Sequence, residues 1–196
     1  MKNHPLNIQR RRLISLAIFY FMLNLTVGLY INSQLIDALV DKRVTFLFSV
    51  ATATIGIKDA VTIILFILLF GLAWAFLKIA GVEIDYQDLY EPMFWFILVA
   101  CLNEIIRFFM AFSVLKPIMH NLLFTNYKEY LSFLKIRFPH TLWIKYERIL
   151  DNSFIITGPL IFGIIFFIRN KRKYSWQDCL ISGLGLALGL GLAQLV

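Results

Sequence analysis

The residues best suited to chemistry lie together near the middle of one apolar segment. Asn103, Glu104 and Arg107 occur in the stretch LNEIIRFF. Residues three apart share one face of an α-helix, so Glu104 and Arg107 are expected to form an ion pair. Ionisable groups inside an apolar segment are costly and usually face a bundle interior or a water-filled cavity. We predict a polar site for an ion, a proton or a substrate headgroup; an ion pair that only fixes helix contacts is the alternative.

The composition indicates that the helices carrying these residues cross a membrane. Of the 196 residues, 60% are hydrophobic and only 16% are charged, whereas about a quarter of a soluble domain is charged. Residues 60–77 read AVTIILFILLFGLAWAFL, without one charge. A helix of that length spans roughly 27 Å, close to the hydrocarbon core of about 30 Å.

Similar apolar segments recur along the chain, separated by short charged connections. They predict an all-α integral membrane helical bundle, with residues 1–196 forming a single polytopic membrane domain. The chain is too short and too uniformly apolar to indicate a second, polar domain. About five transmembrane helices are expected, over residues 13–31, 60–77, 93–115, 153–168 and 180–196.

Two intervals do not fit simple spans. Residues 44–57 are uncharged but too short to cross comfortably. They are interfacial, re-entrant, or the first part of one long helix that continues through 60–77 and bends near Gly56, and we favour the last. Residues 116–152 place apolar side chains at spacings of three and four, interrupted at Pro139. We expect amphipathic helices at the membrane surface here, with Trp143 at headgroup level.

The charge distribution bears on partners and orientation. The net charge is +7, and compact basic clusters stand at residues 10–12 and 169–173. Anionic lipid headgroups attract such juxtamembrane cations. No polar domain offers a nucleic acid a basic face, so we expect membrane lipids as partners and no nucleic acid. The clusters favour a cytoplasmic N-terminus in the cell (inner) membrane, because cytoplasmic connections carry an excess of Lys and Arg.

The final apolar segment is rich in small residues, which let helix backbones approach closely. Its partner is expected to be another span of this chain, a membrane-protein partner or a second copy in a homo-oligomer. The small residues are Gly183, Gly185, Ala187, Gly189 and Gly191.

No residue pattern predicts a metal or cofactor site. Cys101 and Cys179 lack metal-site spacing and are interpreted as small apolar residues. His120 and His140 follow prolines outside the expected spans and have no second ligand at helical spacing. We expect no metal and no cofactor.

Two short stretches resemble known families. LNEIIRFF resembles the helix of CAAX-type intramembrane proteases that carries paired glutamates and an arginine, with Asn103 in place of the first glutamate and Arg107 one residue early. This resemblance implies a membrane enzyme in which a histidine reaches Glu104. The stretch DLYEP, residues 88–92, is similar to the DLYGP motif of the Yip family of Rab-interacting membrane proteins, with Glu91 replacing glycine.

These observations lead to three functional hypotheses. The first is a non-enzymatic multi-pass protein that serves as a subunit or accessory component of a larger membrane assembly. The second is a small transporter or channel with a polar site at Glu104 and Arg107. The third is an intramembrane enzyme of the CAAX-type protease kind.

Overall fold

The computed structural model describes residues 5–38, 44–122, 124 and 127–193. The described residues are 90% helical and include no β-strand. This confirms the predicted all-α fold. The elements are α1 (Pro5–Asp37), α2 (Val44–Ile79), the 3-10 turn η1 (Tyr86–Leu89), α3 (Tyr90–Met110), the π-helical turn η2 (Ala111–Leu115), α4 (Lys116–His120), α5 (Tyr127–Ser132), the π-helical turn η3 (Phe133–Arg137), the 3-10 turn η4 (Phe138–His140), α6 (Leu142–Asn170) and α7 (Trp176–Ala193).

Four stretches of helix among the described residues are long and apolar enough to cross a membrane. Only 6% to 28% of the residues in their apolar windows are buried inside the protein. Most of this apolar surface therefore points outward, where a bilayer would cover it. The four stretches are Ile8–Asp37, Thr52–Ile79, Tyr86–His120 and Leu142–Asn170. The fifth expected span, 180–196, falls on α7 and is not among them; residues 194–196 lie outside the described part, and this span stays a prediction.

The structure joins two pairs of neighbouring segments into single helices. Residues 44–57 continue without interruption into the expected second span, so α2 is one helix of 36 residues, as favoured from the sequence. The section 116–152 is expected from the sequence to hold helices separate from the span 153–168, but its last residues, 142–152, form the first turns of α6. No proline or glycine lies between 142 and 157, so nothing in the sequence stops the helix before the apolar segment.

Helix ends are fixed by recognisable local chemistry. Gly81 has φ of 79°, a left-handed conformation that glycine adopts without strain. Its N–H donates to the Lys78 carbonyl and the Val82 N–H donates to the Leu77 carbonyl, both at 3.0 Å. This is the Schellman arrangement that closes a helix C-terminus. At the start of α7, Ser175 and Asp178 cap each other reciprocally, with the Ser175 N–H donating to Asp178 Oδ2 at 2.7 Å.

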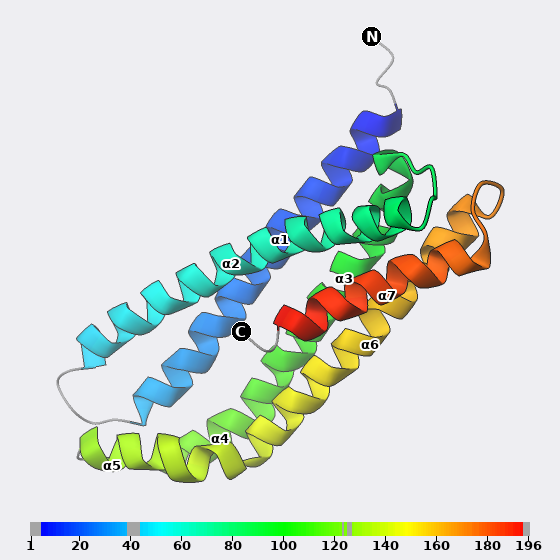
Figure 1. Ribbon diagram of the computed structural model, residues 1–196. Helices are drawn as coiled ribbons and strands as arrows, with labels where there is room; N and C mark the ends of the chain where they lie inside the picture. Colours follow the sequence, from blue (N-terminus) through cyan, green and yellow to red (C-terminus); the bar gives the residue numbers. More distant parts are fainter. Residues whose placement is uncertain (1–4, 39–43, 123, 125–126, 194–196) are drawn as a thin grey trace. The chain divides into compact units, whose positions relative to one another are not determined.

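The chain forms two compact units, and each is described by itself. Unit 1 comprises Met1–Phe21, Val61–Cys101 and Ser153–Val196. In this unit α7 folds back beside α6, as Figure 1 shows in red and orange. A Cβ on Gly163 would lie 3.2 Å from the Cys179 carbonyl oxygen, and one on Gly183 equally close to the Pro159 carbonyl oxygen. Glycine at both positions therefore permits backbone contact between α6 and α7.

Unit 2 comprises Met22–Ala60 and Leu102–Asn152. Its core contains Trp143, which is only 2% exposed. The tryptophan therefore packs inside the protein, and its expected position at the level of the lipid headgroups stays a prediction. Buried residues of α5 and η3, Tyr130 and Phe133, lie on the apolar face of the expected amphipathic section. The core cluster is Ala38, Ala111, Leu115, Met119, Phe133 and Trp143.

Candidate functional site

The ion pair expected between Glu104 and Arg107 is present in unit 2. Arg107 Nη1 donates to Glu104 Oε1 at 2.7 Å, one helical turn away on α3. The Glu104 residue is only 3% exposed. It lies close to the middle of the stretch Tyr86–His120, so its carboxylate is far from either end of that apolar helix. The sequence therefore identified an ion pair near the middle of an apolar helix, where charge is costly when the helix crosses a bilayer.

A third charged residue, which the sequence did not indicate, completes this cluster. Arg107 Nη2 donates to Asp151 Oδ1 of α6, 44 residues further along the chain. The guanidinium is thus held between two carboxylates through separate nitrogens, which fixes its plane. Because the Asp151 side chain is 41% exposed while that of Glu104 is 5% exposed, Arg107 links a buried carboxylate to an accessible one.

The cluster borders a cavity of 220 Å³ within unit 2. Along α1 its lining extends from Asn24 to Asn32, eight residues or about 12 Å of helix rise. Asn24 is near the middle of the apolar stretch Ile8–Asp37, whereas Asn32 is near its end. The polar lining therefore extends from mid-helix toward one helix end. The lining residues are Asn24, Val27, Gly28, Ile31, Asn32, Thr54, Ile55, Glu104, Arg107 and Glu147.

Glycine makes room for this arrangement at one point. A Cβ on Gly28 would lie 3.0 Å from Ile55 Cγ2, closer than side chains normally approach. Gly28 therefore lets α1 come close to α2 beside the cavity. Any larger residue would push the two cavity walls apart or force Ile55 to move.

Charged groups of both signs line the cavity. Glu104 and Glu147 contribute carboxylates, and Arg107 contributes a guanidinium that also binds Asp151. All three lining residues interact with other groups of the protein, so these charges are already engaged.

Other residues singled out from the sequence do not join this cavity. Asn103, half-buried and adjacent to Glu104, is not part of its lining. His120 and His140 are exposed and do not line it either. The histidine approach to Glu104 that a CAAX-type protease would need is therefore not observed at the cavity. Within the described residues, no three His, Cys, Asp or Glu side chains could hold a metal ion.

The small residues of α7 are mostly engaged within unit 1. A Cβ on Gly185 would lie 2.9 Å from the Phe76 ring, and one on Gly189 would lie 2.6 Å from Leu69. These two glycines therefore pack against α2, and Gly183 packs against α6. Ala187 lines a groove beside α6. A Cβ on Gly191 would have no other atom within 4 Å, so this glycine is not required by close packing.

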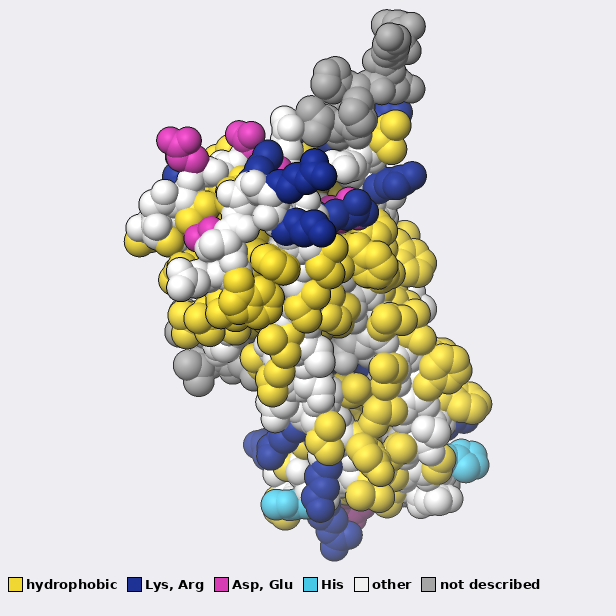
Figure 2. Space-filling model, turned by 90° about the vertical axis from the view of Figure 1, so that its right-hand side faces the viewer, with side chains coloured by type: hydrophobic (Ala, Val, Ile, Leu, Met, Phe, Trp, Pro, Cys, Tyr) yellow, Lys and Arg dark blue, Asp and Glu magenta, His cyan; other side chains and the backbone are white. Residues whose placement is uncertain are grey.

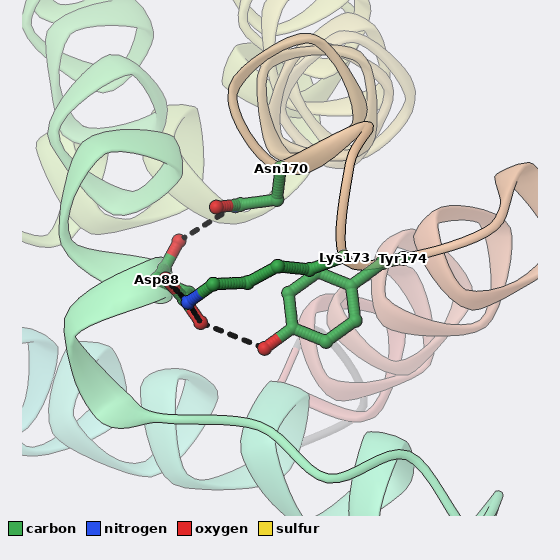
Figure 3. Close-up of polar contacts among 4 residues, drawn as sticks. All are labelled: Asp88, Asn170, Lys173 and Tyr174. Atoms are coloured by element: carbon green, nitrogen blue, oxygen red, sulfur yellow. Dashed lines mark hydrogen bonds and ion pairs between the residues drawn. The ribbon is translucent and has the colours of Figure 1, made fainter.

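A second polar cluster, in unit 1, involves the DLYEP stretch. Asp88 accepts two hydrogen bonds of 3.1 Å from the Lys173 ammonium and one of 2.7 Å from the Tyr174 hydroxyl. The Asn170 side chain donates to the Asp88 carbonyl at 3.2 Å. Figure 3 shows these groups converging on one residue. The cluster ties the turn before α3 to the connection between α6 and α7.

Tyr174 and Glu91 extend this second cluster. Burial raises the pKa of Tyr174 above its usual range, and the hydrogen bond to the Asp88 carboxylate raises that pKa further. Glu91 accepts a hydrogen bond of 2.5 Å from Arg169, whose side chain is 61% exposed. The residues similar to the Yip motif thus make a structural connection between loops.

No protein-family model, curated protein or solved structure matches this chain. Four apolar helices among the described residues are compatible with a polytopic α-helical membrane protein. The distinguishing feature of this one is a buried, hydrogen-bonded charge cluster beside a polar cavity.

Proposed function

We propose that the protein is a small membrane transporter or channel for small cations, protons included, with its ion site in the cavity of unit 2. The single observation that carries the proposal is Glu104, a carboxylate that is 3% exposed and lines a polar cavity near the middle of an apolar helix. Ionisable groups at such depth typically mark ion pathways and proton relays.

The chemistry of the lining supports a cation as the transported species. Glu104 and Glu147 supply carboxylate oxygens. Amide and hydroxyl oxygens of Asn24, Asn32 and Thr54 add neutral ligands of the kind that hard cations prefer.

The connection between Glu104 and Asp151 supports a route for the ion. Arg107 contacts both carboxylates, and Asp151 is the accessible one. A cation that displaces Arg107 from Asp151 would next meet Glu104, the other carboxylate that binds the same guanidinium.

A flux measurement tests the proposal. The full chain is reconstituted into liposomes, and the decay of imposed proton, Na⁺ and K⁺ gradients is followed with ion-sensitive dyes. The wild-type protein is expected to accelerate the decay of at least one gradient. Glu104→Gln keeps the shape of the side chain but removes its charge, and is expected to lose most of that flux.

Glu83→Gln is the matched control, because Glu83 is an exposed carboxylate in the connection after α2. It should conduct like wild type. Wild-type liposomes that hold all three gradients as well as empty ones would overturn the proposal. So would a folded Glu104→Gln protein with unchanged flux.

The assembly-subunit hypothesis remains a prediction. It rested on the lack of a complete catalytic motif, on the few polar groups in the apolar segments and on the small residues of the last helix. Three of these small residues, Gly183, Gly185 and Gly189, contact other helices of the same chain. The glycine pattern is therefore accounted for by packing within unit 1, and the described residues supply no separate observation that favours a partner protein.

A further inference from the structure

A groove runs along the outer side of α6 and α7 in unit 1. Its volume is 370 Å³ and every residue that lines it is apolar. Ile156, Leu160 and Ile164 follow one another at helical spacing on α6, and each is at least 45% exposed. The lining residues are Ile155, Ile156, Pro159, Leu160, Gly163, Ile164, Trp176, Cys179, Leu180, Gly183, Leu184 and Ala187.

The opposite wall belongs to α7 and has the same spacing. Trp176, Leu180 and Leu184 stand four residues apart and are 45% to 62% exposed. Between the two walls, Gly163 and Gly183 sit where α6 and α7 make backbone contact. The result is a trough with two rows of apolar side chains and small residues between them, directed along the helices. A long, flexible, unbranched chain fits such a shape.

The end of the trough at Trp176 adjoins a basic connection. Residues 169–173 contain four cations, of which Arg169 binds Glu91 and Lys173 binds Asp88. Lys171 and Arg172 are exposed and form no ion pair with any described residue. Two positive charges are thus available beside the groove. Figure 2 shows Lys and Arg side chains gathered next to hydrophobic side chains on the face that it displays.

We infer that this groove binds an anionic phospholipid, with one acyl chain in the trough and the phosphate near Lys171 and Arg172. Tryptophan favours the level of the headgroups, so Trp176 marks the boundary between the two parts of the lipid. The cations supply charge complementarity that a zwitterionic lipid satisfies less well. A hydrophobic helix from a second protein would fill the trough but leave both cations without a counter-charge.

Native mass spectrometry of the delipidated full-length protein tests the inference. Dioleoyl phosphatidylglycerol and dioleoyl phosphatidylcholine are added separately, and the fraction of protein carrying one lipid is compared. We expect phosphatidylglycerol to bind about tenfold more tightly. Equal binding of the two lipids would overturn the proposal, and so would a protein dimer formed in place of the lipid complex.

Paired variants locate the headgroup. Lys171→Gln combined with Arg172→Gln should abolish the preference for phosphatidylglycerol. Lys145→Gln combined with Arg148→Gln removes the same charge from exposed positions of unit 2 and should leave the preference intact. An equal effect of both pairs would show unspecific attraction by net charge and would contradict the proposed site.

A second pair locates the acyl chain. Ala187→Trp fills the groove and should weaken binding of both lipids. Leu188→Trp introduces the same side chain one residue along α7, at a position that is 57% exposed and outside the groove. The Leu188→Trp protein should bind both lipids as wild type does. If Ala187→Trp bound lipid like wild type, the acyl chain would not lie in this groove. None of these residues lines the cavity at Glu104, so failure here leaves the proposed ion transport untouched.

Discussion

Two polar clusters with similar components differ mainly in burial. In unit 2, Arg107 bonds to Glu104 and Asp151, and the side chains of Arg107 and Glu104 are 13% and 5% exposed. In unit 1, Arg169 and Lys173 pair with Glu91 and Asp88, and both basic side chains are more than half exposed. Solvent competes for the second set of charges, whereas in the first set only Asp151 is substantially exposed. The comparison predicts that the same kind of substitution has very different effects in the two units.

The largest effect is expected for Arg107→Ala. This change leaves the Glu104 carboxylate buried without its cation, which costs about 3–5 kcal/mol of stability. Thermal unfolding in detergent, followed by circular dichroism, measures the change. The double variant Glu104→Leu with Arg107→Met removes both charges at similar volume and should recover most of the stability, because a well-packed apolar pair often replaces a buried ion pair at little cost.

A double variant that does not recover stability would change the explanation of the difference between the two clusters. If the double variant were as unstable as Arg107→Ala, the stability would depend on the bond between Arg107 and Asp151 and not on the charge of Glu104. An Arg107→Ala protein that unfolded like wild type would show that water reaches the cluster freely, and the contrast between the units would be wrong.

An intermediate, pH-dependent effect is expected at Tyr174. Its pKa is raised in the folded protein, so the unfolded chain loses this proton first as the pH rises. Stability from the buried hydroxyl is therefore fully present below about pH 10 and declines above it. Tyr174→Phe should be less stable than wild type at neutral pH, and its melting temperature should fall less steeply between about pH 10 and pH 11.

Parallel alkaline profiles for the two proteins would contradict this prediction.

The smallest effect is expected for Arg169→Ala. Its partner Glu91 has a side chain that is 29% exposed, and the arginine itself is 61% exposed. Exposed pairs contribute about 0–1 kcal/mol, so the melting temperature should change little. The contribution of the Arg169–Glu91 pair to stability should also disappear in high salt, whereas the contribution of the buried Arg107 pair should persist. A loss comparable to that of Arg107→Ala would remove the distinction between the two clusters.

Local sequence patterns predicted much of this molecule. Long apolar runs predicted the helices that are long and apolar enough to cross a membrane, and the spacing of Glu104 and Arg107 predicted their ion pair. The patterns did not decide which apolar faces are covered by other parts of the protein. Trp143 and the apolar face at Tyr130 and Phe133 satisfy the periodicity of a surface helix equally well whether lipid or protein covers them. In the structure, protein covers them.

The sequence by itself determined that the chain is helical, apolar enough to cross a membrane, and charged at one point deep in a helix. These properties depend on side-chain type and on spacings of three or four residues, which are the same in any tertiary arrangement. Only the tertiary structure decided that Asp151 meets Arg107, that Asn24 and Glu147 share a cavity with Glu104, and that Asp88 gathers Lys173 and Tyr174. Each of these contacts joins residues more than forty positions apart, and helical periodicity carries no information about which distant faces come together.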